Sequence, residues 1–165
     1  MKRGVTMKEK TCCFTGHRII PPAILPKLSA ELESTLLLLI QRGFCYFGAG
    51  GALGFDTLCA ETVLRLKAKF PHIRLILVLP CRNQTKGWTS GQIRQYKQIL
   101  SQADKVVYTA DDYFPGCMHR RNRHLVDCSS VCVAYCTRAT GGTAYTVDYA
   151  RKQGLQIIGL TGQNA

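Results

Sequence analysis

Six short apolar runs recur along the chain, each separated from the next by a longer segment, and this alternation restricts the possible folds most. The runs lie at residues 11–15, 44–48, 73–79, 105–109, 131–136 and 156–160. They are rich in β-branched and aromatic residues. Continuous apolar runs of this length are typical of strands that are buried on both faces of a sheet.

The segments between these runs have the periodicity of helices. Apolar side chains recur three or four residues apart in segments 22–42 and 55–69, and shorter helices are predicted at 90–103, 117–129 and 142–153. Regular strand–helix alternation requires crossover connections and therefore a parallel sheet with helices on both faces. We predict an α/β domain of the Rossmann-like, doubly wound type. Its mainly parallel sheet of about six strands is expected in the order 3-2-1-4-5-6 along the sheet.

Length and composition are consistent with a single globular domain. The chain has 165 residues, of which 46% are hydrophobic and 19% charged, so its composition is not that of a disordered protein. We expect residues 1–10 to be a flexible basic extension and residues 11–165 to form the domain. The N-terminus lacks an apolar signal core, and no run reaches the ~20 residues of a membrane span. A cytoplasmic protein without a membrane partner is therefore expected.

The nine cysteines are predicted to be reduced residues of the core. Their number is odd, and several lie within predicted buried strands, where cysteine behaves as a small apolar residue. Cys128, Cys132 and Cys136 recur every four residues, which raises the alternative of a metal site. Zinc sites usually use C-x-x-C pairs on turns, however, whereas Cys132 and Cys136 lie in a strand pattern. We expect no metal site.

The formal net charge is +12, which is high for this length. A strongly basic chain favours polyanionic partners such as nucleotides, nucleic acid or an acidic protein. The alternative is that scattered lysines and arginines serve only solubility, since no long basic run is present.

Ligands of open α/β sheets bind beyond the carboxyl ends of the strands, near the reversal in strand order, so the residues after each strand are the candidates. The first strand ends in Thr15-Gly16-His17-Arg18. Gly16 allows a ligand close to the backbone, and the forked guanidinium of Arg18 suits a phosphate. His17 is interpreted as a hydrogen-bonding wall of the pocket, because no nucleophile or carboxylate partner is apparent for it.

The second strand leads into a glycine-rich loop that ends at Asp56. Four glycines within seven residues suggest exposed N–H groups at a helix N-terminus, which is an anion-binding arrangement. The spacing matches neither the dinucleotide fingerprint G-x-G-x-x-G nor the Walker pattern. Asp56 suits the first turn of the next helix, where the helix dipole favours a carboxylate. The four glycines are Gly48, Gly50, Gly51 and Gly54.

Three later loops add candidates. Gln84 and Trp88 follow the third strand, and Trp88 either stacks on a base or pins the loop to the core. Arg121 and Asn122 lie in the basic segment 119–124, whose charge either faces a phosphate or is simply solvated. The fifth strand leads to Gly141-Gly142-Thr143, a second glycine-rich helix N-terminus that suits a phosphate.

In this order the motifs resemble the SLOG superfamily of Rossmann-like proteins, named for its Smf/DprA and LOG groups. The similarity to the YpsA-like branch runs from about residue 11 to residue 160. It is carried by T-G-H-R, G-x-x-x-G-x-D, the Gln…Trp loop, Arg121-Asn122 and G-G-T-x-x-T. The resemblance implies a bacterial, homodimeric sensor or regulatory module without a required cofactor. Its implied ligand is a nucleotide or a nucleotide-derived molecule similar to ADP-ribose or NAD.

Two alternatives to pure ligand binding remain. The LOG group implies an N-glycosidase acting on a nucleoside monophosphate, a reaction that needs a carboxylate near the ribose. Laid on this chain from Gly141, the LOG motif P-G-G-x-G-T-x-x-E puts Asp148 in place of its glutamate, and Asp56 is the other candidate. The Smf/DprA group implies single-stranded DNA binding, which the basic charge also favours.

Overall fold

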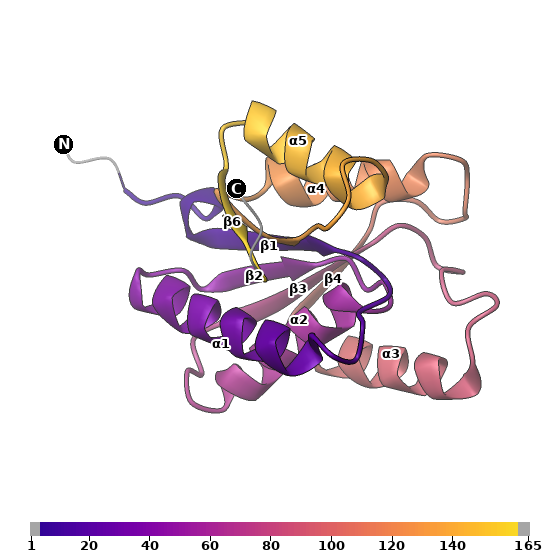
Figure 1. Ribbon diagram of the computed structural model, residues 1–165, viewed down its shortest axis with the longest axis horizontal. Coiled ribbons are helices and arrows are strands. Elements are labelled where there is room, and N and C mark those ends of the chain that lie inside the picture. Colours follow the sequence, from indigo (N-terminus) through magenta and orange to yellow (C-terminus); the bar gives the residue numbers. More distant parts are fainter. Residues whose placement is uncertain (1–3, 162–165) are drawn as a thin grey trace.

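In the computed structural model, residues 4–161 form one six-stranded sheet flanked by helices (Figure 1). The strands are β1 (Thr11–Gly16), β2 (Tyr46–Ala49), β3 (Arg74–Leu79), β4 (Lys105–Tyr108), β5 (Val131–Tyr135) and β6 (Gln156–Gly159). The helices are α1 (Leu25–Gln41), α2 (Phe55–Lys67), α3 (Ser90–Gln102), α4 (Cys117–Asp127) and α5 (Gly142–Lys152). Of the predicted extension, residues 1–3 lie outside the described residues, and Lys8–Lys10 form a short 3-10 turn. Residues 162–165 of the predicted domain also lie outside them.

All five strand pairings are parallel, which confirms the predicted Rossmann-like α/β class. The predicted strand order is wrong, because the sheet runs β4-β3-β2-β1-β5-β6. The fourth strand lies beyond β3 at the sheet edge instead of beside β1. Helices α1, α2 and α3 cover one face of the sheet, and α4 and α5 cover the other (Figure 1).

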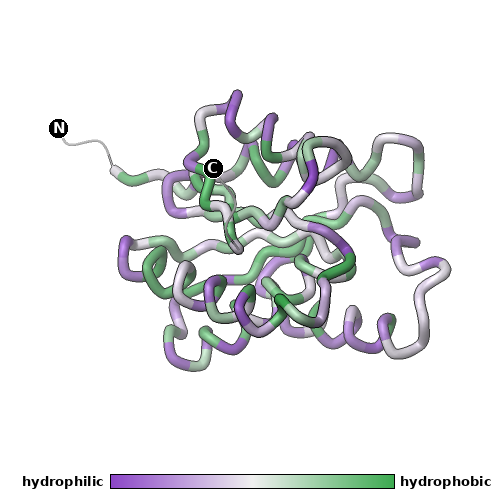
Figure 2. Tube along the Cα trace, in the orientation of Figure 1, coloured by the Kyte–Doolittle hydropathy of each residue, from purple (hydrophilic) through white to green (hydrophobic). Residues whose placement is uncertain are grey.

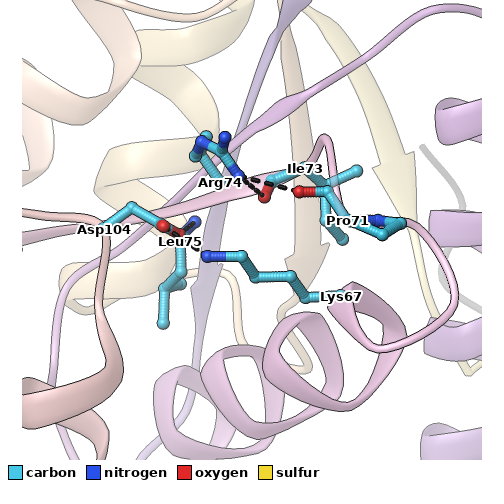
Figure 3. Close-up of polar contacts among 6 residues, drawn as sticks. All are labelled: Lys67, Pro71, Ile73, Arg74, Leu75 and Asp104. Carbon is cyan, nitrogen blue, oxygen red and sulfur yellow. Dashed lines mark hydrogen bonds and ion pairs between the residues drawn. The ribbon is translucent and has the colours of Figure 1, made fainter.

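Local contacts around Asp104 explain why β4 pairs with β3. The Asp104 carboxylate accepts a hydrogen bond from the Leu75 N–H at 2.8 Å and forms an ion pair with Lys67 of α2 (Figure 3). The Asp104 N–H donates to the Leu75 carbonyl at 2.9 Å. These bonds place the start of β4 against β3. The lengths of the apolar runs do not show whether β4 pairs with β3 or with β1, because a right-handed crossover can add a strand at either edge of a sheet.

The chain therefore builds the sheet outward from β1 through β4 and then returns to the other side of β1 with β5. The connections that follow β1 and β5 leave on opposite faces of the sheet, α1 on one side and α5 on the other (Figure 1). The carboxyl ends of these two neighbouring strands are thus the topological switch point. In open α/β sheets the ligand crevice forms at such a point.

The core consists of one apolar layer on each side of the sheet (Figure 2). Leu32 and Leu36 of α1 pack with Phe47 of β2 in the larger layer. The smaller layer holds Val126 of α4 and Ala150 of α5. Of the cysteines predicted to lie in strands, three are buried and two are half-buried; these are Cys12, Cys13 and Cys132, and Cys45 and Cys136. Within residues 4–161, no helix is both long and apolar enough to cross a membrane.

Candidate functional site at the switch point

A cavity of about 320 Å³ opens at the carboxyl ends of β1 and β5, and we call it the switch-point cavity. The loop after β1, the first turn of α2, helix α4 and the N-terminus of α5 form its walls. Its lining residues are Phe14, Thr15, Gly16, His17, Arg18, Ile19, Ala52, Asp56, Met118, Arg121, Asn122, Arg138, Gly142 and Thr143. The cavity thus lies where the strand order reverses.

The loop after β1 packs directly on the start of α2. The Phe55 N–H donates to the His17 carbonyl at 3.0 Å. A Cβ on Gly54 would overlap the backbone of Arg18, and Gly54 has a φ of 79°. A Cβ on Gly16 would overlap the Phe55 ring. Both glycines are therefore required by the close approach of two chain segments.

His17 joins the β1 loop to the loop after β5. Its Nε2 accepts a hydrogen bond from the Thr137 N–H at 2.7 Å, so this nitrogen carries no proton. The imidazole also lies edge-on to Tyr135, with ring centroids 5.3 Å apart. Burial and the nearby charge of Arg138 lower the pKa of His17 below its usual 6.5. The side chain is a neutral wall of the cavity near pH 7.

Arg121 and Asp56 form the buried base of the cavity. Their exposed fractions are only 4% and 7%. Arg121 donates from Nη1 to the Gly50 carbonyl and from Nε to Asn122 at 2.7 Å, while the Asp56 carboxylate accepts from the Ala52 N–H at 3.2 Å. Burial raises the pKa of Asp56, and the charge of Arg121 opposes that rise. The base therefore holds one carboxylate and one guanidinium whose charges act on each other, although no ion pair within 4.0 Å joins them among the described residues.

The positive charge available to a ligand comes from the rim. Arg18 and Arg138 are exposed and line the cavity, and no ion pair between described residues involves either of them. Gly142 and Thr143 add the first turn of α5, whose N–H groups lack intrahelical acceptors. Two guanidiniums beside a helix N-terminus form an environment suited to a phosphate or carboxylate.

The structure brings together nine of the residues expected at the site. These are Thr15, Gly16, His17, Arg18, Asp56, Arg121, Asn122, Gly142 and Thr143. The other expected residues do not line the switch-point cavity. They are Gly48, Gly50, Gly51, Gly54, Gln84, Trp88 and Gly141.

The glycines between β2 and α2 are closely packed, whereas a Cβ on Gly141 would have nothing within 4 Å. A Cβ on Gly48 would lie 2.9 Å from the Leu125 side chain, and one on Gly51 would overlap Leu79. Trp88 lies edge-on to Tyr96 of α3 at 5.5 Å, which corresponds to the loop-pinning alternative. Gln84 is buried next to Gly51, where a Cβ on Gly51 would lie 3.6 Å from Gln84 Oε1. The side-chain amide of Gln84 has no hydrogen-bond partner among the described residues. The glycine-rich segment thus packs closely against its neighbours and reaches the switch-point cavity through Ala52 and Asp56.

Arg138, Ala52 and Met118 line the cavity although the sequence did not single them out. Arg138 could have been predicted from the sequence, because it lies in the loop after the fifth strand, and ligands bind at the carboxyl ends of the strands. Met118 carries no comparable signal, since a methionine in a basic helix has no distinctive spacing.

The two candidate carboxylates have different surroundings. Asp56 lines the switch-point cavity. Asp148 is exposed, forms an ion pair with Lys152 at 3.0 Å and lines a neighbouring groove instead. In the described part of the chain, no cluster of three histidine, cysteine or acidic side chains is arranged to hold a metal ion.

Comparison with known proteins places the chain among bacterial relatives. The family model YpsA, described as the YspA SLOG family, matches residues 23–157. The SPbeta prophage-derived protein YoqJ of Bacillus subtilis is 32% identical over 139 residues, which cover 76% of this chain and 81% of YoqJ.

Two solved structures of DNA processing protein A share the fold. The Streptococcus pneumoniae protein has a TM-score of 0.70 at 14% identity, and the match covers 95% of this chain but only 52% of that protein. The Helicobacter pylori protein, whose structure concerns its single-stranded DNA binding mode, has a TM-score of 0.67 at 19% identity, covering 95% and 68%. This chain therefore spans about half the length of the S. pneumoniae protein.

Proposed function

The chain belongs to the YspA SLOG family, and on that premise we propose that its switch-point cavity binds a nucleotide or a nucleotide-derived ligand such as ADP-ribose or NAD. The observation that carries the proposal is the pairing of Arg18 and Arg138 with the N-terminus of α5 at the rim of the cavity. Such a site attracts the phosphate groups that all these ligands share.

The buried base supports specificity for this type of ligand. Asp56 lines the cavity and is an acceptor for ligand hydroxyl or amine groups, while Arg121 keeps its charge compensated. The cavity thus offers donors for phosphate at the rim and an acceptor at its base. A ribose phosphate carries both complementary groups.

Isothermal titration calorimetry with AMP, ADP-ribose and NAD tests the proposal. Arg18→Ala is expected to weaken binding at least about tenfold, because a charge-assisted hydrogen bond contributes about 1.5–3 kcal/mol. Arg94→Ala is the matched control, since Arg94 is an exposed arginine of α3 and is not part of the cavity lining. Absence of binding up to millimolar ligand, or equal effects of both substitutions, contradicts the proposal.

A second candidate function is hydrolysis of the N-glycosidic bond of a nucleoside monophosphate. The observation that favours it is that Asp56 lines the cavity and that burial raises its pKa. A carboxyl group in such surroundings suits proton transfer to a leaving base. Chromatography of AMP after incubation tests this, with release of free adenine expected from the wild type and not from Asp56→Asn. Intact AMP in both samples contradicts it.

Nucleic-acid binding is a third candidate, favoured by the net charge of +12 and by the DNA-binding H. pylori relative. Oligo-dT binding in a gel-shift assay is expected to weaken steeply with salt if phosphate contacts dominate. A gel shift of oligo-dT that is unchanged in Arg18→Ala contradicts a role for the switch-point cavity in nucleic-acid binding.

The expected homodimer is tested by sedimentation equilibrium.

A further inference from the structure

A second, larger cavity of about 830 Å³ lies along α5 and the loop after β5, and we call it the α5 groove. Its polar lining includes Thr137, Arg138, Thr140, Asp148 and Arg151. Arg138 lines both the α5 groove and the switch-point cavity. The N-terminus of α5 lies between them, with Gly141 in the groove and Gly142 in the cavity.

The groove carries a net positive charge. Within residues 4–161 no ion pair involves Arg138 or Arg151, whereas the one carboxylate in the lining, Asp148, pairs with Lys152 at 3.0 Å. The groove lining therefore holds two guanidiniums without an ion-pair partner and one carboxylate that is already paired. The apolar part of the lining comes from Val147 and Ile157. An amphipathic groove of this type suits an anionic ligand with a flat apolar face.

Tyr145 is a fixed aromatic side chain in the groove lining. Its hydroxyl accepts a hydrogen bond from Arg123 Nη1 at 3.1 Å, and its ring lies against the edge of His119 with centroids 4.3 Å apart. Despite these contacts the residue is 40% exposed. An aromatic ring that is held in place and still accessible is a stacking partner for a planar ring.

We propose that the α5 groove is a second subsite for one elongated ligand, whose anionic middle lies beside Arg138 and whose planar end stacks on Tyr145. This inference rests on the proposed function of the switch-point cavity. The ligand class is a nucleoside diphosphate joined to a second nucleoside, so that each end carries a planar ring. The diphosphate lies at the N-terminus of α5, where negative charge is favoured, and the two ends occupy the two cavities.

The sizes of the two cavities agree with this division. About 320 Å³ is at the low end of the range for small-molecule sites, whereas about 830 Å³ is well within it. A mononucleotide would occupy only the first cavity and leave Tyr145 and Arg151 without contact. The affinity for the elongated ligand should therefore depend on residues of the α5 groove that a mononucleotide does not contact.

Calorimetric titration of wild type and variants with NAD and with AMP tests this inference, because NAD carries a second planar ring beyond its AMP half. Tyr145→Ala and, independently, Arg151→Gln are expected to weaken NAD binding about tenfold or more and to change AMP binding by less than about twofold. Tyr145→Phe keeps the ring and is expected to bind like the wild type. Tyr113→Ala is the matched control, because Tyr113 is an exposed tyrosine outside both cavities.

The outcomes separate the subsite from the proposed function. Binding of both ligands with equal affinity, or equal losses for both ligands in Tyr145→Ala and Arg151→Gln, overturns the second subsite and leaves the switch-point cavity as a binding site. Failure of the wild type to bind either ligand overturns both proposals. If Tyr145→Ala does not fold, Arg151→Gln decides, because Arg151 is an exposed residue in the last turn of α5.

Discussion

Arg121 of α4 and Asp56 of α2 approach each other at Gly50, and only a glycine fits between them. A Cβ on Gly50 would lie 2.5 Å from Arg121 Nη1 and 2.8 Å from Asp56 Oδ2. Helices on opposite faces of the sheet therefore contribute one charge each to the buried base of the switch-point cavity. The two charges compensate each other where water is excluded.

Removing one member of this pair is expected to destabilise the protein strongly. Arg121→Met leaves a buried carboxylate uncompensated and should lower the free energy of unfolding by about 3–5 kcal/mol. The double variant Asp56→Asn/Arg121→Met should lose less than the sum of the two single variants, because it removes both charges. Urea denaturation measures all four proteins. Strictly additive losses would show that the two charges are not coupled.

Gly54 is expected to be far less tolerant of substitution than Gly87. Both have a positive φ, of 79° and 85°. A Cβ on Gly54 would overlap the Arg18 backbone, whereas one on Gly87 has nothing within 4 Å. Gly87→Ala should therefore cost only the backbone strain of about 1–2 kcal/mol, and Gly54→Ala should cost about 1–3 kcal/mol more. Equal losses in thermal or urea denaturation would contradict the packing role of Gly54.

The edge position of β4 is expected to depend on Asp104. Asp104→Ala removes both the acceptor of the Leu75 N–H and the partner of Lys67, and should cost about 1–3 kcal/mol (Figure 3). Asp111→Ala is the control. Its side chain is 88% exposed and pairs with Arg82 at 3.5 Å, so its loss should stay below about 0.5 kcal/mol. Urea denaturation compares the two variants, and similar losses would argue against the anchoring role of Asp104.

Stability is expected to fall on acidification because of His17. Its pKa is lowered in the folded protein, so below about pH 6.5 the unfolded chain binds a proton that the folded chain rejects. The stabilising contribution is complete above that pH and is lost as the pH falls toward the folded pKa. His17→Gln does not titrate, and its amide oxygen can accept the Thr137 N–H.

The measurement compares unfolding free energies of the wild type and His17→Gln between about pH 8 and about pH 5. The other titrating groups are common to both proteins, so they cancel in the difference. The wild type should lose stability relative to the variant on acidification. Parallel curves would show that the imidazole is not held neutral by its surroundings.

Much of the candidate site was predictable because its residues follow strands directly. Thr15, Arg18 and Gly142 lie at the carboxyl edge of the sheet, where any parallel α/β topology would put them. The roles of Gly50 and Gly51 were not predictable in this way. A glycine that exposes its N–H to an anion and a glycine that makes room for a neighbouring side chain look the same in a sequence.

Apolar periodicity and crossover geometry act locally, so the α/β class, the parallel sheet and the edge at which ligands are expected could be predicted from the amino-acid sequence. Three features became visible only in the folded protein: β4 lies outside β3, Arg121 lies near Asp56 while Asp148 lies in a separate groove, and Arg138 lines two cavities. These features depend on contacts between segments far apart in the chain. Such contacts are selected by packing and by charge compensation between neighbours that a linear pattern does not identify.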